Sequence, residues 1–128
     1  MTRSEVMSRI HSSGTRLEDR FRRLARQARA RIRRADKMFG KPDFRILGTR
    51  TLVFVNSCFW HGCRWHCRMP GSRRGYWVPK IKRNVERQRQ VVRKLRRSGY
   101  DVLVVWEHSI DRTPARVLRQ LRGATPRI

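Results

Sequence analysis

Ten residues, CFWHGCRWHC at 58–67, contain all three cysteines of the chain and two of its four histidines. Zinc in proteins is usually held by four sulfur or nitrogen ligands in a tetrahedron. The predicted structural zinc site uses Cys58, Cys63, His66 and His108, and Cys67 is an alternative to His66. The spacing matches no common zinc finger, so buried thiols with an incidental imidazole are the competing interpretation.

Carboxylates are scarce, with nine Asp and Glu in 128 residues. Asp43 follows Gly-Lys-Pro at the start of a predicted strand, where nucleases of the restriction-enzyme type hold Mg²⁺. A plain turn aspartate gives the same pattern. Glu18 is a second candidate, although it also completes a T-x-x-E capping box with Thr15. Asp36 is a weaker third.

His61 remains once zinc is satisfied, and an imidazole there suits a general base acting on water. The alternative is an imidazole on the surface, or one that contacts a metal ligand without taking part in the reaction. Three aromatic residues stand near it in arginine-rich sequence: Phe59, Trp60 and Trp77. Exposed aromatics on a basic surface favour stacking or wedging between bases, whereas core packing is the ordinary explanation.

The charge balance points to a polyanionic partner. Lys and Arg total 33, the formal net charge is +24 and the pI is near 11.9. Nucleic acid attracts such a chain through counterion release. A ribosomal-type or chromatin-type binding protein without chemistry fits the same composition. No apolar run is long enough for a membrane span, the N-terminus lacks a signal-peptide core, and three cysteines favour a reduced cytoplasmic setting.

The elements that must position these groups follow from periodicity. A helix is predicted over 15–30, a β-hairpin from strands 43–47 and 51–55, and a helix from about 79 to 97 stopped by Gly99. A strand at 100–106 and a helix after Thr113-Pro114 complete the order. We therefore expect an α/β sandwich with a small mixed sheet flanked by helices, formed by one domain over 15–128, with residues 1–14 as a separate arm. Strands 51–55 and 100–106 are expected to end side by side.

Together these motifs resemble the very short patch repair DNA mismatch endonucleases. The resemblance rests on CFWHGC at 58–63, Tyr76-Trp77-x3-Ile81-x2-Asn84, VVWEH at 104–108 and Gly40-x-Pro42-Asp43, and it covers about residues 3–110. It implies a restriction-endonuclease-like fold with a structural zinc, and a monomeric enzyme that nicks 5′ to the T of a T·G mismatch left by 5-methylcytosine deamination. It also implies double-stranded DNA and mismatch-repair proteins as partners. The expected location is the nucleoid, where the protein would be bound to DNA.

By position, the resemblance makes Asp43 the principal Mg²⁺ ligand and the backbone carbonyl of Val55 another. Glu18 and His61 become catalytic residues, with His61 as the base. Phe59, Trp60 and Trp77 become a wedge beside the mismatch, and the arm at 1–14 reaches the DNA from the other groove. Asn56 departs from the pattern, since relatives carry a histidine or an acid there. That departure sustains a second reading, a non-catalytic zinc-stabilised DNA-binding protein.

Overall fold

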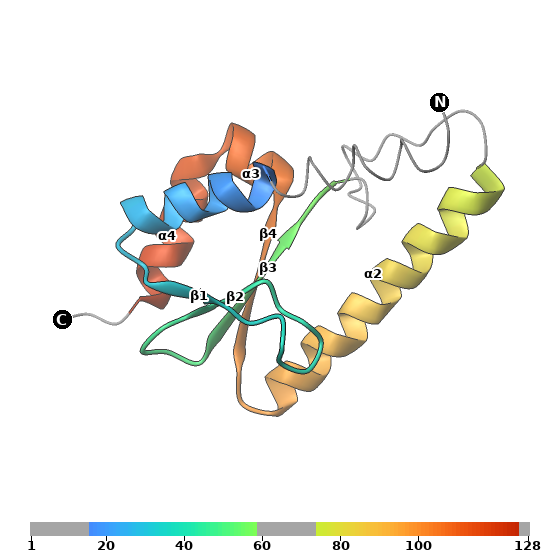
Figure 1. The fold of residues 1–128 in the computed structure, drawn as a ribbon, viewed down its shortest axis with the longest axis horizontal. Coiled ribbons are helices and arrows are strands. Elements are labelled where there is room, and N and C mark those ends of the chain that lie inside the picture. The colour runs from blue at the N-terminus through green and yellow to red at the C-terminus, as the bar shows by residue number, and fades with distance from the viewer. Residues whose placement is uncertain (1–15, 59–73, 126–128) are drawn as a thin grey trace.

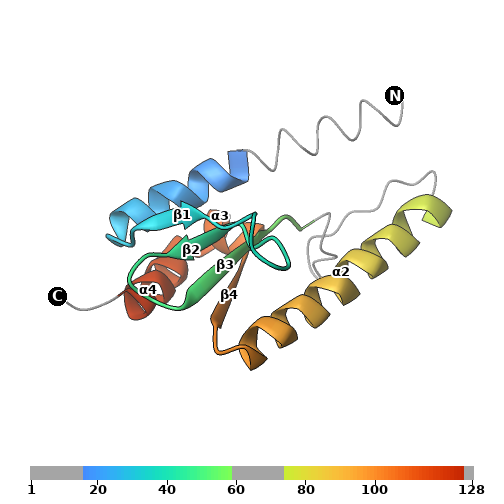
Figure 2. The same cartoon turned by 60° about the horizontal axis from the view of Figure 1, so that its bottom comes forward.

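The computed structural model describes residues 16–58 and 74–125, and these form three layers. A four-stranded sheet lies between α2 on one face and the N-terminal helix, α3 and α4 on the other (Figures 1 and 2). The strand order is β1-β2-β3-β4. This confirms the predicted mixed α/β architecture, which is consistent with a restriction-endonuclease-like fold.

The sheet is mixed because a hairpin precedes a crossover. β2 (Phe44–Ile46) pairs antiparallel with β3 (Thr51–Asn56), as the turn around Gly48 predicts. β3 then pairs in parallel with β4 (Asp101–Trp106) after the chain crosses through α2. In this register Val55 lies opposite Val105 and Asn56 opposite Trp106, so the two strands end together, as predicted.

Two clusters of apolar side chains hold the layers together. β3 is buried along its whole length, and its side chains alternate between the two faces of the sheet. The cluster under the N-terminal helix, α3 and α4 includes Leu17, Phe21, Leu24, Phe44, Ile46, Val53, Val105, Val117 and Leu121. The cluster under α2 includes Leu52, Phe54, Val92, Leu95 and Val102.

The N-terminal helix ends earlier than its apolar pattern predicts. Helical residues run from 16 to 27, and Arg29 has a left-handed φ of 58°. Ala30 N–H donates to the Ala25 carbonyl and Arg29 N–H to the Arg26 carbonyl, which is the bond pair of a Schellman cap. This cap turns the chain into β1 (Ile32–Arg34), a strand that the sequence analysis missed.

Two further boundaries correct the prediction. α2 (Arg74–Arg97) begins at Arg74 and contains Pro79, whereas the predicted helix began at about 79. α3 (Glu107–Arg112) is a short helix that was not predicted and directly follows β4. Gly99 ends α2 with a φ of 93°, as predicted.

The last helix, α4 (Pro114–Ala124), begins at Pro114 as predicted, with Thr113 at the N-cap position. The Thr113 hydroxyl accepts no capping hydrogen bond from the helix, and it donates to the Ser109 carbonyl at 3.3 Å. Over the described part of the chain, no helix combines the length and the apolarity needed to cross a membrane.

Candidate functional site

Asp43 stands where β2 begins, and it ties that strand to the end of β3. Its Oδ2 accepts the Val55 N–H at 2.7 Å, while its own N–H donates to the Val53 carbonyl at 3.0 Å. Because Phe44 points into the cluster under the N-terminal helix, the preceding side chain points to the α2 face. The hairpin therefore brings Asp43 and the Val55 backbone together, as the sequence analysis expected.

Burial destabilises the charged form of Asp43. The pKa of this carboxyl is raised from 3.8 to about 6, chiefly by removal from water and in smaller part by the nearby Glu18 and Asp36. The Val55 N–H and the Arg34 guanidinium act in the opposite direction and lower this pKa. Glu18 and Asp36 thus add negative charge around Asp43, and Arg34 compensates the charge of Asp43 only in part.

Glu18 reaches this point from the N-terminal helix and is held there by an arginine. Arg34 Nη2 contacts Glu18 Oε2 at 2.6 Å, and Arg34 Nη1 contacts Glu18 Oε1 at 3.4 Å. The Glu18 side chain is thus engaged by a two-pronged guanidinium from β1. Arg34 is a site residue that the sequence analysis missed, because its strand was not predicted.

A cavity of about 410 Å³ opens beside Asp43, between the strand ends and α2. Gly40 lets α2 approach here, since a Cβ at this residue would lie only 2.2 Å from Val91 Cγ1, and its φ is +78°. Basic and amide side chains also line this cavity. The lining residues are Gly40, Lys41, Asp43, Phe54, Val55, Asn56, Asn84, Arg87, Gln88 and Val91.

Asn56 and Gln88 form a reciprocal amide pair at the back of this cavity. Asn56 Nδ2 donates to Gln88 Oε1 at 2.7 Å, and Gln88 Nε2 donates to Asn56 Oδ1 at 2.9 Å. Asn56 is 1% exposed, so the half-buried Gln88 supplies hydrogen-bond partners for an amide that is removed from water. The pair fastens the end of β3 to α2, immediately after the Val55 carbonyl.

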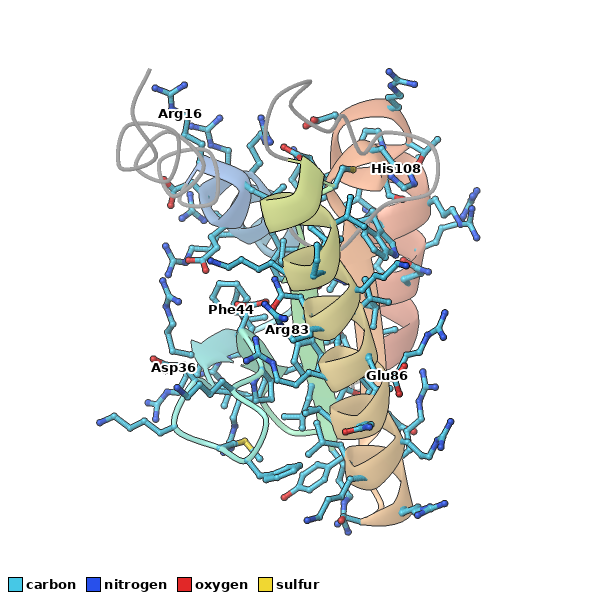
Figure 3. All side chains as sticks on the ribbon, turned by 90° about the vertical axis from the view of Figure 1, so that its right-hand side faces the viewer. Arg16, Asp36, Phe44, Arg83, Glu86 and His108 are labelled. Carbon is cyan, nitrogen blue, oxygen red and sulfur yellow. The ribbon has the colours of Figure 1, made fainter. Side chains whose placement is uncertain are left out.

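Two of the predicted zinc ligands, Cys58 and His108, lie within the described residues. Cys58 Sγ lies 3.5 Å from His108 Nδ1, as expected from the parallel pairing of β3 and β4. Cys58 N–H donates to Glu107 Oε1 at 3.1 Å, and Glu107 Oε2 lies 3.5 Å from Arg20 Nη2. His108 also stacks on Trp106, with the ring centroids 6.3 Å apart. In Figure 3, His108 lies near the α3 end of the molecule.

Several predicted residues fall outside the described ranges, namely Phe59, Trp60, His61, Cys63, His66 and Cys67. The backbone of Trp77 belongs to α2, and its side chain lies outside the described part of the chain. Within residues 16–58 and 74–125, no three His, Cys, Asp or Glu side chains gather as a metal-ion site. The predicted zinc site is therefore represented here by Cys58 and His108 alone.

Comparison with known proteins gives consistent matches. The sequence model of the family described as DNA mismatch endonuclease Vsr matches residues 1–67. The DNA mismatch endonuclease Vsr of Escherichia coli K12 is 36% identical over 110 residues, which cover 83% of this chain and 69% of that protein. The type II nicking enzyme V.NmeAIP of Neisseria meningitidis serogroup A is 38% identical over 108 residues, or 82% of this chain and 76% of that enzyme.

The type II nicking enzyme V.NaeI of Lentzea aerocolonigenes is 44% identical over 77 residues. That match covers 60% of this chain and 46% of V.NaeI, so it spans less than half of that relative.

Proposed function

The chain belongs to the DNA mismatch endonuclease Vsr family, and from this premise we propose that it nicks duplex DNA 5′ to the T of a T·G mismatch, with Mg²⁺ as catalytic ion. The observation that carries the proposal is the Asp43 carboxylate. It is partly buried, it accepts the Val55 N–H, and its pKa is raised to about 6 at the edge of a cavity. A carboxylate kept in that state binds a cation readily, because the cation relieves its poorly compensated charge.

The donor set fits Mg²⁺. This ion takes oxygen ligands, and it commonly uses one or two carboxylates while substrate phosphate and water fill the remaining positions. Asp43 offers its second carboxylate oxygen, and the Val55 carbonyl is the neighbouring backbone donor. When bound, the ion supplies charge stabilisation at the phosphate and makes water more acidic.

The remaining steps fall to the chain's own side chains. Lys41 and Arg87 line the cavity and provide positive charge for the phosphate groups of the nicked strand. His61 is the proposed general base that takes a proton from the attacking water. Glu18, fixed by Arg34, is the proposed second carboxylate of the site. Neither amide of the Asn56–Gln88 pair takes up or releases a proton near neutral pH, so we assign the pair the role of positioning the end of β3.

Mismatch selectivity is assigned to the aromatic residues Phe59, Trp60 and Trp77, with the arm at 1–14 contacting the opposite groove. Inserting a wedge costs about a few kcal/mol for each unstacked step. That cost is lower at a T·G wobble, which is already weakly stacked, so the wedge favours the mismatch over matched sequence.

A structural zinc completes the proposal. Cys58 and His108, whose Sγ and Nδ1 atoms lie 3.5 Å apart, would supply a thiolate and an imidazole. Cys63 with either His66 or Cys67 would supply the other two ligands. Glu107 supports this arrangement because it accepts the Cys58 backbone N–H. Such a site fixes the segment that bears Phe59, Trp60 and His61.

The test is a nicking assay with Mg²⁺ on a duplex that contains one T·G mismatch, each strand labelled in turn. The matched duplex and the Asp43→Ala variant serve as controls. A single cut 5′ to the mismatched T, absent from both controls, is the expected result. Tight DNA binding without any cut, in several sequence contexts, would instead establish a zinc-held binding protein and overturn the enzymatic proposal.

A further inference from the structure

A second groove lies on the flank of α2 opposite the Asp43 cavity. It has a volume of about 600 Å³, and its floor is apolar, with Val92 buried and Val104 half-buried. Exposed arginines form its walls. The lining residues are Gln88, Arg89, Val92, Arg93, Arg96, Arg97 and Val104.

The two hollows are separated by α2 itself. At about 100° per residue, Asn84, Arg87 and Val91 lie on one side of the sheet-facing line of the helix. Arg89, Arg93 and Arg96 lie on the other side, and Gln88 lines both hollows. Figure 3 looks onto the outer face of α2. Arg83 lies on the side of this helix nearer to Phe44 and Asp36, and Glu86 lies on the opposite side.

We propose that this groove, called here the α2–β4 arginine groove, binds a second stretch of DNA phosphate backbone away from the nicked bond. The inference extends the proposed function, but it concerns binding rather than catalysis. Within the described ranges, none of the four arginines makes an ion pair with a carboxylate. Arg96 is already positioned, since its Nη2 donates to the Val102 carbonyl at 3.3 Å.

The pattern of the charges favours a nucleic acid strand over an acidic peptide. Arg89 and Arg96 are about 10 Å apart along the helix axis, and Arg93 lies between them. A DNA strand carries a negative charge on every nucleotide, so its backbone can meet the three guanidinium groups in succession. An extended peptide turns alternate side chains away, so it can do the same only if every second residue is acidic.

The chemistry of the groove supports the same choice. Guanidinium groups bind phosphate oxygens in a two-pronged geometry and lose little order in doing so. The floor of Val92 and Val104 offers an apolar surface for deoxyribose between the phosphates. A sugar–phosphate backbone therefore matches both the walls and the floor.

The test compares two variants of equal net charge in the full chain. Arg89→Gln/Arg93→Gln removes two groove arginines, both exposed, and Arg116→Gln/Arg119→Gln removes two exposed arginines of α4. Affinity for a matched duplex is measured by fluorescence anisotropy without Mg²⁺ over a range of salt concentrations. Neither nicking nor mismatch recognition enters this measurement, so failure of the proposed function leaves it intact.

The groove variant is expected to bind the duplex roughly tenfold or more weakly at about 0.1 M salt, with a salt slope smaller by about 1.8, because each lost phosphate contact removes about 0.9. The α4 variant should change the slope far less. Equal slopes for the two variants would overturn the proposal. A groove variant that loses affinity for poly-glutamate but keeps its affinity for duplex would also overturn it and assign the groove to an acidic protein.

Discussion

Asp43→Asn is predicted to stabilise the Mg²⁺-free protein while it abolishes nicking. The pKa of Asp43 is about 6 in the folded chain against 3.8 for an ordinary aspartate. Its contribution to stability is therefore fully present below about pH 4 and is lost as the pH rises through 6. Asparagine carries no charge at any of these pH values, and its Oδ1 can still accept the Val55 N–H.

The size of the effect follows from the pKa difference. A shift of about two units corresponds to about 3 kcal/mol of lost folding free energy above pH 7, at 1.36 kcal/mol per unit. Asparagine recovers at most that amount, because a buried amide also costs some desolvation. For a chain of this size 1 kcal/mol moves Tm by roughly 4 °C, so the expected gain at pH 8 is at most about 12 °C.

The assay is thermal unfolding of wild type and Asp43→Asn at about pH 4.5 and pH 8, without Mg²⁺ and without chelators that would remove zinc. Moderate salt, about 0.3 M, screens the long-range effect of the net charge. Asp101→Asn is the matched control, because Asp101 is exposed at the start of β4. The gain should appear at pH 8, shrink at pH 4.5 and be absent in the control.

Addition of Mg²⁺ should then raise the Tm of wild type and leave that of Asp43→Asn unchanged, because ligand binding stabilises only the form that binds. If Asp43→Asn unfolds at or below the wild-type temperature at pH 8, Asp43 is not an energetically strained carboxylate, and the argument for a cation site at this residue fails.

Three other perturbations test separate parts of the site. Asn56→Ala and Gln88→Ala should each lower the free energy of unfolding, measured with urea, by about 1–3 kcal/mol. Each should also raise the Mg²⁺ concentration for half-maximal nicking. The double variant should lose clearly less stability than the sum of the two single losses, and additive losses would contradict the pairing. Arg34→Gln should raise the pKa of Asp43 and move the acidic limb of the kcat/KM profile to higher pH, since Arg34 now lowers that pKa; an unmoved limb refutes the coupling. Cys58→Ser should lose zinc measured by elemental mass spectrometry and lower Tm, and full retention of zinc contradicts its role as a ligand.

The parts of the fold that sequence predicts are those with local causes. The hairpin turn around Gly48 fixes the pairing of β2 with β3, and this pairing alone brings Asp43 to the Val55 N–H. Gly99 ends α2 because the left-handed conformation there suits glycine. The end-to-end alignment of β3 and β4 follows from their parallel pairing, and it accounts for the proximity of Cys58 and His108.

The missed parts depend on partners distant in the chain. β1 is a three-residue Ile-Arg-Arg segment with no strand pattern of its own, and it forms because the edge of β2 offers hydrogen bonds. The preceding helix ends at a Schellman cap with Arg29 in the place where glycine is the usual signal. Gln88 lies 32 residues from Asn56, and no local pattern relates the two amides.

The end of β3 joins the two proposed metal sites through a very short stretch of chain. Val55 gives its N–H to Asp43, Asn56 is fastened to α2 by Gln88, and Cys58 meets His108 three residues after Val55. A displacement of β3 along β4 by one residue reverses the faces of its side chains, so Asn56 leaves Gln88 and the approach of Cys58 to His108 is lost at the same time. The neutral Asn56–Gln88 pair holds this register at every pH at which the protein folds, which an ionisable pair at the same place does not do. An amide at residue 56 is therefore compatible with an active enzyme, because its contribution is to the position of the neighbouring Val55 carbonyl rather than to proton transfer.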